Sequence, residues 1–210
     1  QLNGFYRSKY EHKGKTHYLA TTQLEAPYAR KAFPCFDEPD KKATFDISML
    51  IDKSLKAISN MPAHIEQPTG KNKALITFQT TPVMSTYLVY LGVGDFEFLQ
   101  DKNKTTRIRI ITTPGKSKYG KFALEITKKF LKYFEDYSEV PYPLPKLDLI
   151  ALPDFAAGAM ENWGAITFRE LVLLFDPKKT STRIKRRIAE VVAHELWHQW
   201  SGNLVTMDWW

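Results

Sequence analysis

Two histidines near the end of the sequence, His194 and His198, are four positions apart and enclose a glutamate, Glu195. Residues four apart in an α-helix lie about 40° apart on one face, so both imidazole rings can reach a single ion. Imidazole nitrogen suits zinc, and a catalytic zinc site combines three protein ligands with one open position. The spacing therefore predicts a zinc site on a helix, with His194 and His198 as ligands.

The glutamate between the histidines has a different predicted role, that of general base. Zinc lowers the pKa of a bound water to about 7, and a nearby carboxylate can carry the proton to a leaving amine. Glu195 is placed for this step, so the pattern predicts peptide hydrolysis without a covalent intermediate. The alternative is a surface helix with two incidental histidines, and the apolar residues 191–193 favour a helix with a buried face instead. The twelve residues after His198 offer one candidate third ligand, Asp208.

A second group of candidate residues precedes the histidines: Gly158, Ala159, Met160, Glu161 and Asn162. A segment such as 158–168 can form an edge strand, with which an extended peptide pairs through its backbone. Gly158 would let that backbone come close, and the Glu161 carboxylate could hold a free α-ammonium by a charge-assisted hydrogen bond. We predict that residues 158–162 bind the amino-terminal end of a peptide. The alternative is that Glu161 is an ordinary loop acid.

Two amphipathic helices are expected in the second half of the chain. The first contains aromatic and aliphatic residues at every fourth position and runs to about Tyr137; these residues are Phe122, Ile126, Phe130 and Phe134. The second carries the histidines: Ser181 or Thr182 can cap it, and we expect it to reach about Trp200 before Gly202 stops it. Residues 147–152 and 165–174 are predicted strands beside these helices.

The first half of the chain is predicted to be a β domain. Its β-rich runs are 44–51, 74–79 and 86–93, and turn-forming residues separate runs of this kind. The pattern changes near residue 101, where a strand at 107–111 leads into the first helix. We therefore expect an α+β chain with two closely packed domains, 1–100 and 101–210.

Composition excludes several other classes of protein. Hydrophobic residues make up 43% and charged residues 25% of the 210 positions, as in globular proteins. No apolar run approaches the roughly 18–20 residues that a membrane span needs. The net charge is +7, and the densest basic run, 178–187, lacks the interleaved aromatics of a nucleic-acid groove, so we expect a solvated helix face and no nucleic-acid partner. The single cysteine, Cys35, cannot form an internal disulfide, which favours a cytoplasmic setting, and we expect it to be a buried apolar residue.

These residues resemble those of a known family, the gluzincin zinc aminopeptidases, which include aminopeptidase N and the puromycin-sensitive aminopeptidase. Residues 158–162 look like the exopeptidase signature of the family, upstream of the His-Glu-x-x-His motif. The segments that carry the rest of the resemblance are 32–39, 59–62, 84–88, 198–200 and 202–210. The resemblance implies a larger enzyme, of which this chain is a fragment: part of a saddle-like amino-terminal β domain, then the amino-terminal portion of a thermolysin-like catalytic domain.

The family resemblance also implies site residues and a cofactor. It places Glu25 beside the peptide amine, together with Glu161. It implies one zinc ion per full-length chain, with a third ligand, a glutamate, and a tyrosine that stabilises the transition state, both beyond the sequence given. We therefore expect a zinc aminopeptidase that acts on peptides with a free amino terminus, and a fragment that is inactive by itself. The alternative is a peptide-binding module on the same fold that does no hydrolysis.

Overall fold

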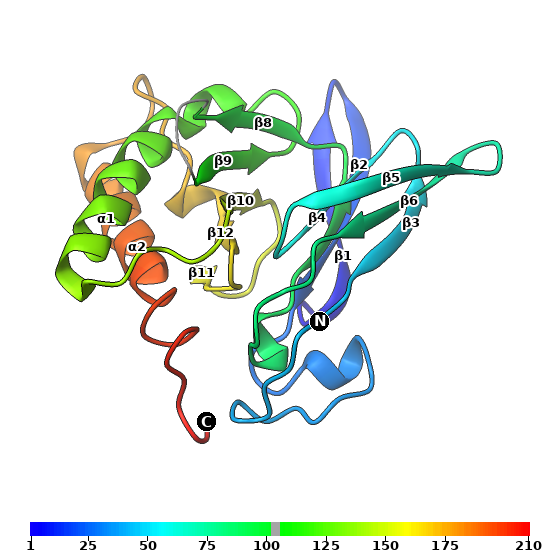
Figure 1. Ribbon diagram of the computed structural model, residues 1–210. Coiled ribbons are helices and arrows are strands. Elements are labelled where there is room, and N and C mark those ends of the chain that lie inside the picture. The colour runs from blue at the N-terminus through cyan, green and yellow to red at the C-terminus, as the bar shows by residue number, and fades with distance from the viewer. Residues whose placement is uncertain (102–105) are drawn as a thin grey trace.

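The computed structural model describes residues 1–101 and 106–210, and it is divided between a β-rich first half and a mixed second half (Figure 1). The expected α+β class is confirmed. The point where the sequence changes character falls partly on residues 102–105, which lie outside the described residues. Among the residues described, no helix is both long enough and apolar enough to cross a bilayer.

The first sheet has four antiparallel strands in the order β1-β2-β7-β4. Their bounds are Gly4–His12, Lys15–Gln23, Leu91–Gly94 and Lys56–Ser59. Strands β1 and β2 form a hairpin whose two loop residues, Lys13 and Gly14, both have positive φ (50° and 71°). This is the turn whose twist matches that of paired strands, and β2 leads from it to Glu25.

A smaller sheet has the strand order β3-β6-β5, and its long β5–β6 hairpin projects from the first half (Figure 1). It consists of Ser48–Asp52, Lys73–Phe78 and Ala63–Thr69. The expected strands 44–51 and 86–93 were both too long at their start. The first begins at Ser48, because residues 44–47 belong to no strand ladder. In the second, residues 86–88 form a 3-10 turn, η2 (Thr86–Leu88), before β7.

The second half is built on a five-stranded sheet in the order β11-β12-β10-β9-β8. The bounds are Ala159–Met160, Ala165–Arg169, Lys146–Leu152, Arg107–Thr112 and Glu97–Gln100. Strands β9, β10 and β12 are parallel, and the two outer strands are antiparallel to their neighbours. Every residue of β10 is buried, as expected for a central parallel strand. Strand β8 precedes residue 101 in sequence yet belongs to this second sheet.

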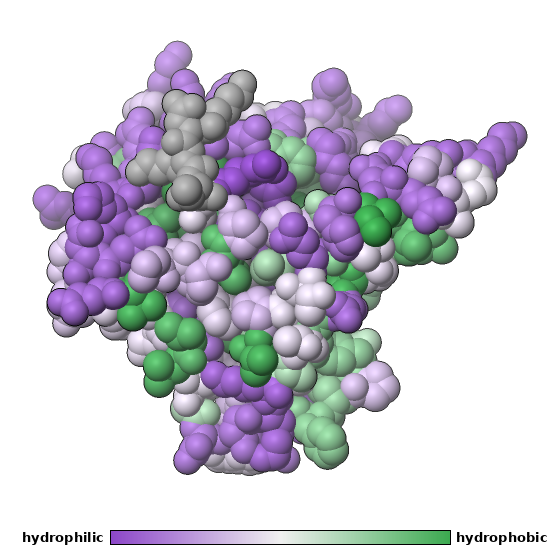
Figure 2. Space-filling view, in the orientation of Figure 1, coloured by the Kyte–Doolittle hydropathy of each residue, from purple (hydrophilic) through white to green (hydrophobic). Residues whose placement is uncertain are grey.

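Two helices, α1 (Lys121–Ser138) and α2 (Thr182–Trp197), lie side by side next to this sheet (Figure 1). Hydrophilic side chains cover the outer surface of α1 (Figure 2), which agrees with its amphipathic pattern. Helix α2 is capped by Ser181, whose Oγ accepts a hydrogen bond from the Ile184 amide. The expected end near Trp200 was three residues too late, because the chain leaves the α-helix at His198 and Gly202 follows with φ of +139°.

One hydrophobic core runs through both halves, and a buried asparagine links their backbones beside it. The Nδ2 of Asn60 donates to the carbonyl oxygens of Leu88 (2.7 Å) and Trp163 (2.9 Å), and its Oδ1 accepts from the Tyr90 amide (2.8 Å). Asn60 is fully buried, so each partner would be left without water if its side chain were removed. The two halves are therefore packed as a unit around this residue.

We predict that Asn60→Ala lowers the free energy of unfolding by about 3 kcal/mol, because buried groups left unpaired cost about 1–3 kcal/mol each. Urea unfolding measures the change. The matched control is Asn3→Ala, which removes one exposed contact with Lys31 and is expected to change stability by less than about 0.5 kcal/mol. Equal effects of the two substitutions would contradict the assigned role of Asn60.

Candidate metal centre and peptide site

The two histidines of α2 present their rings to a common point. The Nε2 atoms of His194 and His198 are 3.0 Å apart, and the ring planes are nearly perpendicular, at 85°. Two nitrogens bound to one tetrahedral zinc at about 2.0–2.1 Å would be about 3.3 Å apart. The observed separation is close to that value, so the pair can chelate one ion.

Hydrogen bonding selects the ring nitrogen that His198 offers. Its Nδ1 lies 3.1 Å from the carbonyl oxygen of Ser201, which can only accept, so Nδ1 carries the proton and Nε2 keeps its lone pair. His194 is exposed, and partial desolvation, followed by the neighbouring His198 and Arg187, lowers its pKa, which favours the neutral ring. Two imidazoles whose Nε2 atoms converge on one point suit zinc.

Glu195 lies between the histidines in sequence but is buried, at 6% exposure, and its Oε2 has no hydrogen-bond partner within the described parts of the chain. Burial raises its pKa to about 8, and the nearby carboxylates of Glu161 and Glu25 add to the shift. A buried carboxyl group with one free oxygen suits either a cation or proton transfer.

Glutamates from distant parts of the sequence lie near His198. Ligand atoms of Glu161, Glu195 and His198 lie within 4.8 Å of one another, and the charge of Glu25 also acts on Glu195. Burial raises the pKa of Glu161. Glu25 remains exposed on one side, yet desolvation by the surrounding protein and the charge of Glu161 raise its pKa, against a lowering by His198. Glu25 follows β2, Glu161 follows β11 and Glu195 lies on α2, so the tertiary fold gathers negative charge where a cation would be stabilised.

The segment before Glu161 forms the outer edge of the five-stranded sheet, where β11 pairs with β12 on one side only. Gly158 is exposed, its φ is not positive, and a Cβ there would meet no atom within 4 Å. The fold itself therefore does not require glycine at 158. A cavity of about 470 Å³ lies between this edge and α2, lined by Gly158, Ala159, Arg187, Glu190, Val191, His194 and Glu195.

Two of the residues predicted to bind substrate, Met160 and Asn162, have fully buried side chains. The Nδ2 of Asn162 donates to the Ala165 carbonyl and to Thr167 Oγ1, both at 3.3 Å, and so closes the turn after β11. The side chain of Asp208, the sequence candidate for a third ligand, is exposed and lies outside the cluster of Glu161, Glu195 and His198. A larger hollow of about 860 Å³ at the start of α2 holds exposed arginines and no histidine.

Sequence reasoning missed two residues that fix Glu161 relative to α2. The Nε2 of Gln199 donates to the carbonyl oxygens of Glu161 (3.2 Å) and Glu195 (3.3 Å), and its Oε1 accepts from the Gly164 amide (3.2 Å). Asn203 donates to the Glu161 carbonyl as well, at 2.8 Å. The sequence feature that could have revealed them is the pair of amide side chains within five residues after the histidine motif.

Comparisons with known proteins identify the family of the chain. A family model described as the Peptidase M1 N-terminal domain matches residues 1–88, and one described as the Peptidase family M1 domain matches residues 122–210. The whole chain is 52% identical to part of a puromycin-sensitive aminopeptidase from Caenorhabditis elegans and to part of aminopeptidase M1-C from Oryza sativa subsp. japonica. It is also 52% identical, over 99% of its length, to probable aminopeptidase 1 of Saccharolobus solfataricus.

The chain spans about a quarter of the length of these relatives, namely 22%, 24% and 26%. Its two matched regions correspond to the β-rich half and to the half that carries the histidine helix. The chain belongs to peptidase family M1.

Proposed function

We propose that this chain forms the amino-terminal β domain and the first part of the catalytic domain of a zinc aminopeptidase, with the division near residue 100. The observation that carries the proposal is the meeting of Glu161, Glu195 and His198 within 4.8 Å. This arrangement puts a group that can hold a peptide amine next to groups that can hydrolyse the adjacent bond.

His194 and His198 would supply two ligands for the ion, and a glutamate outside the sequence given would supply the third. When bound, zinc polarises a carbonyl oxygen and lowers the pKa of a water toward about 7. Glu195 takes a proton from the attacking water and returns it to the leaving amine. Its burial supports the return of the proton, since a carboxyl with a raised pKa holds a proton more readily than an exposed one, and a cation at the histidines would favour the ionised form that accepts it.

Glu161 and Glu25 would bind the α-ammonium of the substrate. In a peptide, the amine nitrogen and the first carbonyl carbon are separated by a single Cα, or about 2.5 Å. An amine held at Glu161 therefore brings the first peptide bond beside Glu195. A peptide paired antiparallel with β11 would run from Glu161 toward Gly158 and into the cavity beside α2.

The single cysteine bears on the cellular compartment of the protein and not on its chemistry. Cys35 is half-buried, and burial, followed by the charge of Asp37, raises the pKa of its thiol, so a nucleophilic role is disfavoured. A chain with one cysteine has no internal disulfide. This supports our proposal of a cytoplasmic enzyme whose partners are peptides with free amino termini.

In the protein that contains this chain, Glu195→Gln is expected to keep zinc and to lower kcat by about 10²–10⁴-fold, because it removes the base without removing a ligand. Zinc analysis and hydrolysis of an amino-acid arylamide measure the two effects. His198→Ala is the contrasting variant and should lose zinc. A decrease of less than tenfold in Glu195→Gln would exclude Glu195 as the base, and no hydrolysis by the wild type would favour a peptide-binding module.

Glu161→Gln should lower kcat/KM for free peptides by about 10²-fold, because an isosteric amide cannot pair with the ammonium charge. The wild type should reject peptides with an acetylated amino terminus, and the variant should lose most of that preference. The control is Glu66→Gln, at an exposed position on β5. Equal cleavage of free and acetylated peptides by the wild type would refute an amine anchor at Glu161.

Gly158→Ala is expected to leave the unfolding midpoint unchanged, since the added methyl meets no neighbour. It should raise KM for peptides of four or more residues by about tenfold, the cost of one or two lost backbone hydrogen bonds. An amino-acid arylamide, which does not extend along β11, should be much less affected. An equal effect on both substrates would argue against pairing of the peptide with this edge.

A further inference from the structure

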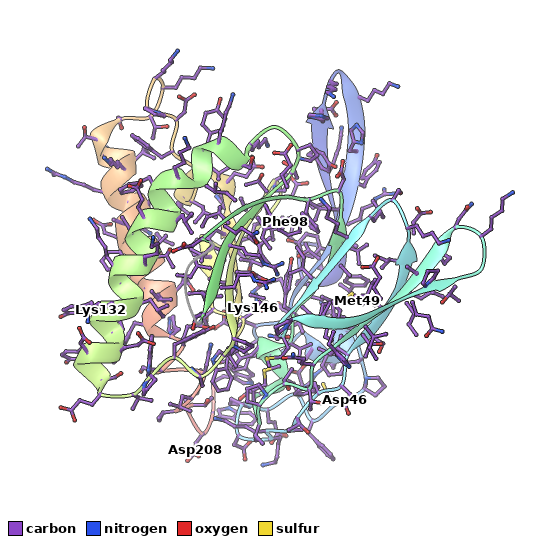
Figure 3. All side chains as sticks on the ribbon, turned by 45° about the horizontal axis from the view of Figure 1, so that its top comes forward. Asp46, Met49, Phe98, Lys132, Lys146 and Asp208 are labelled. Atoms are coloured by element: carbon purple, nitrogen blue, oxygen red, sulfur yellow. The ribbon has the colours of Figure 1, made fainter. Side chains whose placement is uncertain are left out.

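A fully buried lysine lies where the two halves meet. Lys146 opens β10, and Figure 3 labels it at the centre of the molecule, between the strands of the two halves. Its Nζ donates to the Ser59 carbonyl at the end of β4 (2.6 Å), to the Gly164 carbonyl (2.7 Å) and to Asp148 Oδ2 (2.7 Å). An ammonium group has three donors, so all of them are used.

The carboxylate partner of Lys146 is itself fixed. Arg109 on β9 binds both oxygens of Asp148, with Nε and Nη2 each 2.6 Å from one oxygen. Asp148 is fully buried, and the paired geometry restricts where the Lys146 ammonium can lie. Lys146 is thus a rigid bridge between β4 of the first half and Gly164 of the second.

Gly164 ends the turn that begins at Glu161, and this turn is held from two sides. On the side of α2, Gln199 binds the Glu161 carbonyl and the Gly164 amide. On the side of the first half, Lys146 binds the Gly164 carbonyl and Asn60 binds the Trp163 carbonyl. Gly164 has φ of +73°, and a Cβ there would lie 2.6 Å from the Asn60 carbonyl oxygen, so the turn fits tightly against the first half.

We propose that Lys146 is a positioning residue for recognition of the peptide amine: it fixes the 161–164 turn against β4, and this sets the direction of the Glu161 carboxylate. Lys146 acts through Gly164 and has no contact with the substrate. The inference rests on the proposed function, because it needs Glu161 to be the amine anchor. It assigns to the first half a part in substrate selection beyond that of Glu25.

The Lys146 bridge should affect recognition of the peptide amine more than it affects metal binding by the histidines. Helix α2 is anchored by its Ser181 cap and by the buried side chains of Ile188, Val192 and Leu196, none of which depends on Lys146. Loss of Lys146 would leave the Gly164 carbonyl bound to the Asp148 amide (3.0 Å) but would remove its ammonium donor and the link to Ser59, so the turn would be held less firmly against β4. The expected consequence is a weaker hold on the free amine with the histidine pair intact.

The test compares Lys146→Met with Arg109→Met in the protein that contains this chain. Each substitution removes one cation from Asp148, but Arg109→Met leaves the lysine contacts with Ser59 and Gly164 in place. Zinc content, the unfolding midpoint, KM, kcat and the ratio of kcat/KM for free over acetylated peptides are measured for both. Lys146→Met should retain zinc, raise KM for free peptides and lower the ratio by about tenfold or more, whereas Arg109→Met should change the ratio by less than about twofold.

Lys146→Arg provides the second variant should Lys146→Met fail to fold. It keeps the charge beside Asp148, but a planar guanidinium cannot direct three donors as a compact ammonium does, so the ratio should decrease by about threefold. An unchanged ratio in a folded, zinc-loaded variant, equal losses in Lys146→Met and Arg109→Met, or failure of both lysine variants to fold would overturn the proposal. A wild type with no preference for free amines would instead overturn the function proposed above.

Discussion

The site depends on one constraint, the need to satisfy the backbone of a buried turn. Residues 161–164 are all buried, and buried backbone groups without partners are costly. Strand pairing cannot supply all the partners, because the chain reverses here between β11 and β12. Gln199 and Asn203 supply them from the end of α2, and Lys146 and Asn60 supply them from the junction of the halves. The same hydrogen bonds that make the turn stable therefore fix Glu161 against the histidine helix.

The acidic side chains of the site repel one another, and this repulsion favours the binding of cations. Glu25, Glu161 and Glu195 all have raised pKa values, first because of desolvation, which is partial for the exposed Glu25, and for Glu25 and Glu195 also because of the neighbouring acids. Grouped carboxylates destabilise a fold unless a cation joins them. A divalent ion at the histidines and an ammonium at Glu161 would each relieve that repulsion. The site thus favours cationic ligands before any contact with a peptide side chain is made.

The parts of this design that local pattern determines were predictable from the sequence. Apolar residues at every fourth position, three phenylalanines and Ile126, predicted α1; the mostly apolar run 147–152 predicted a buried strand; and the i,i+4 histidines predicted a shared ring direction. Local pattern also misled: residues 86–93 are apolar enough for a strand but start with a 3-10 turn, and Met160 and Asn162 belong to a signature segment yet are buried. The sequence did not reveal the roles of Lys146, Gln199 and Asn203. Each of these side chains binds backbone groups that lie between 18 and 87 positions away, and only the tertiary structure brings them together.

In the proposed function, the position of the edge strand links these contacts to the number of residues removed from the substrate. Because β11 is antiparallel to β12 and ends directly before Glu161, a peptide added to its outer side would direct one end toward the acidic cluster. The Gln199 contacts join the backbones of Glu161 and Glu195, and the Lys146 contacts join the turn to β4. A site that removed one residue from a free amino terminus would need both restraints. In the proposed enzyme the β-rich half takes part in substrate selection, because Ser59, through Lys146, and Asn60 add to the hold that Gln199 and the Asp148 amide have on the turn.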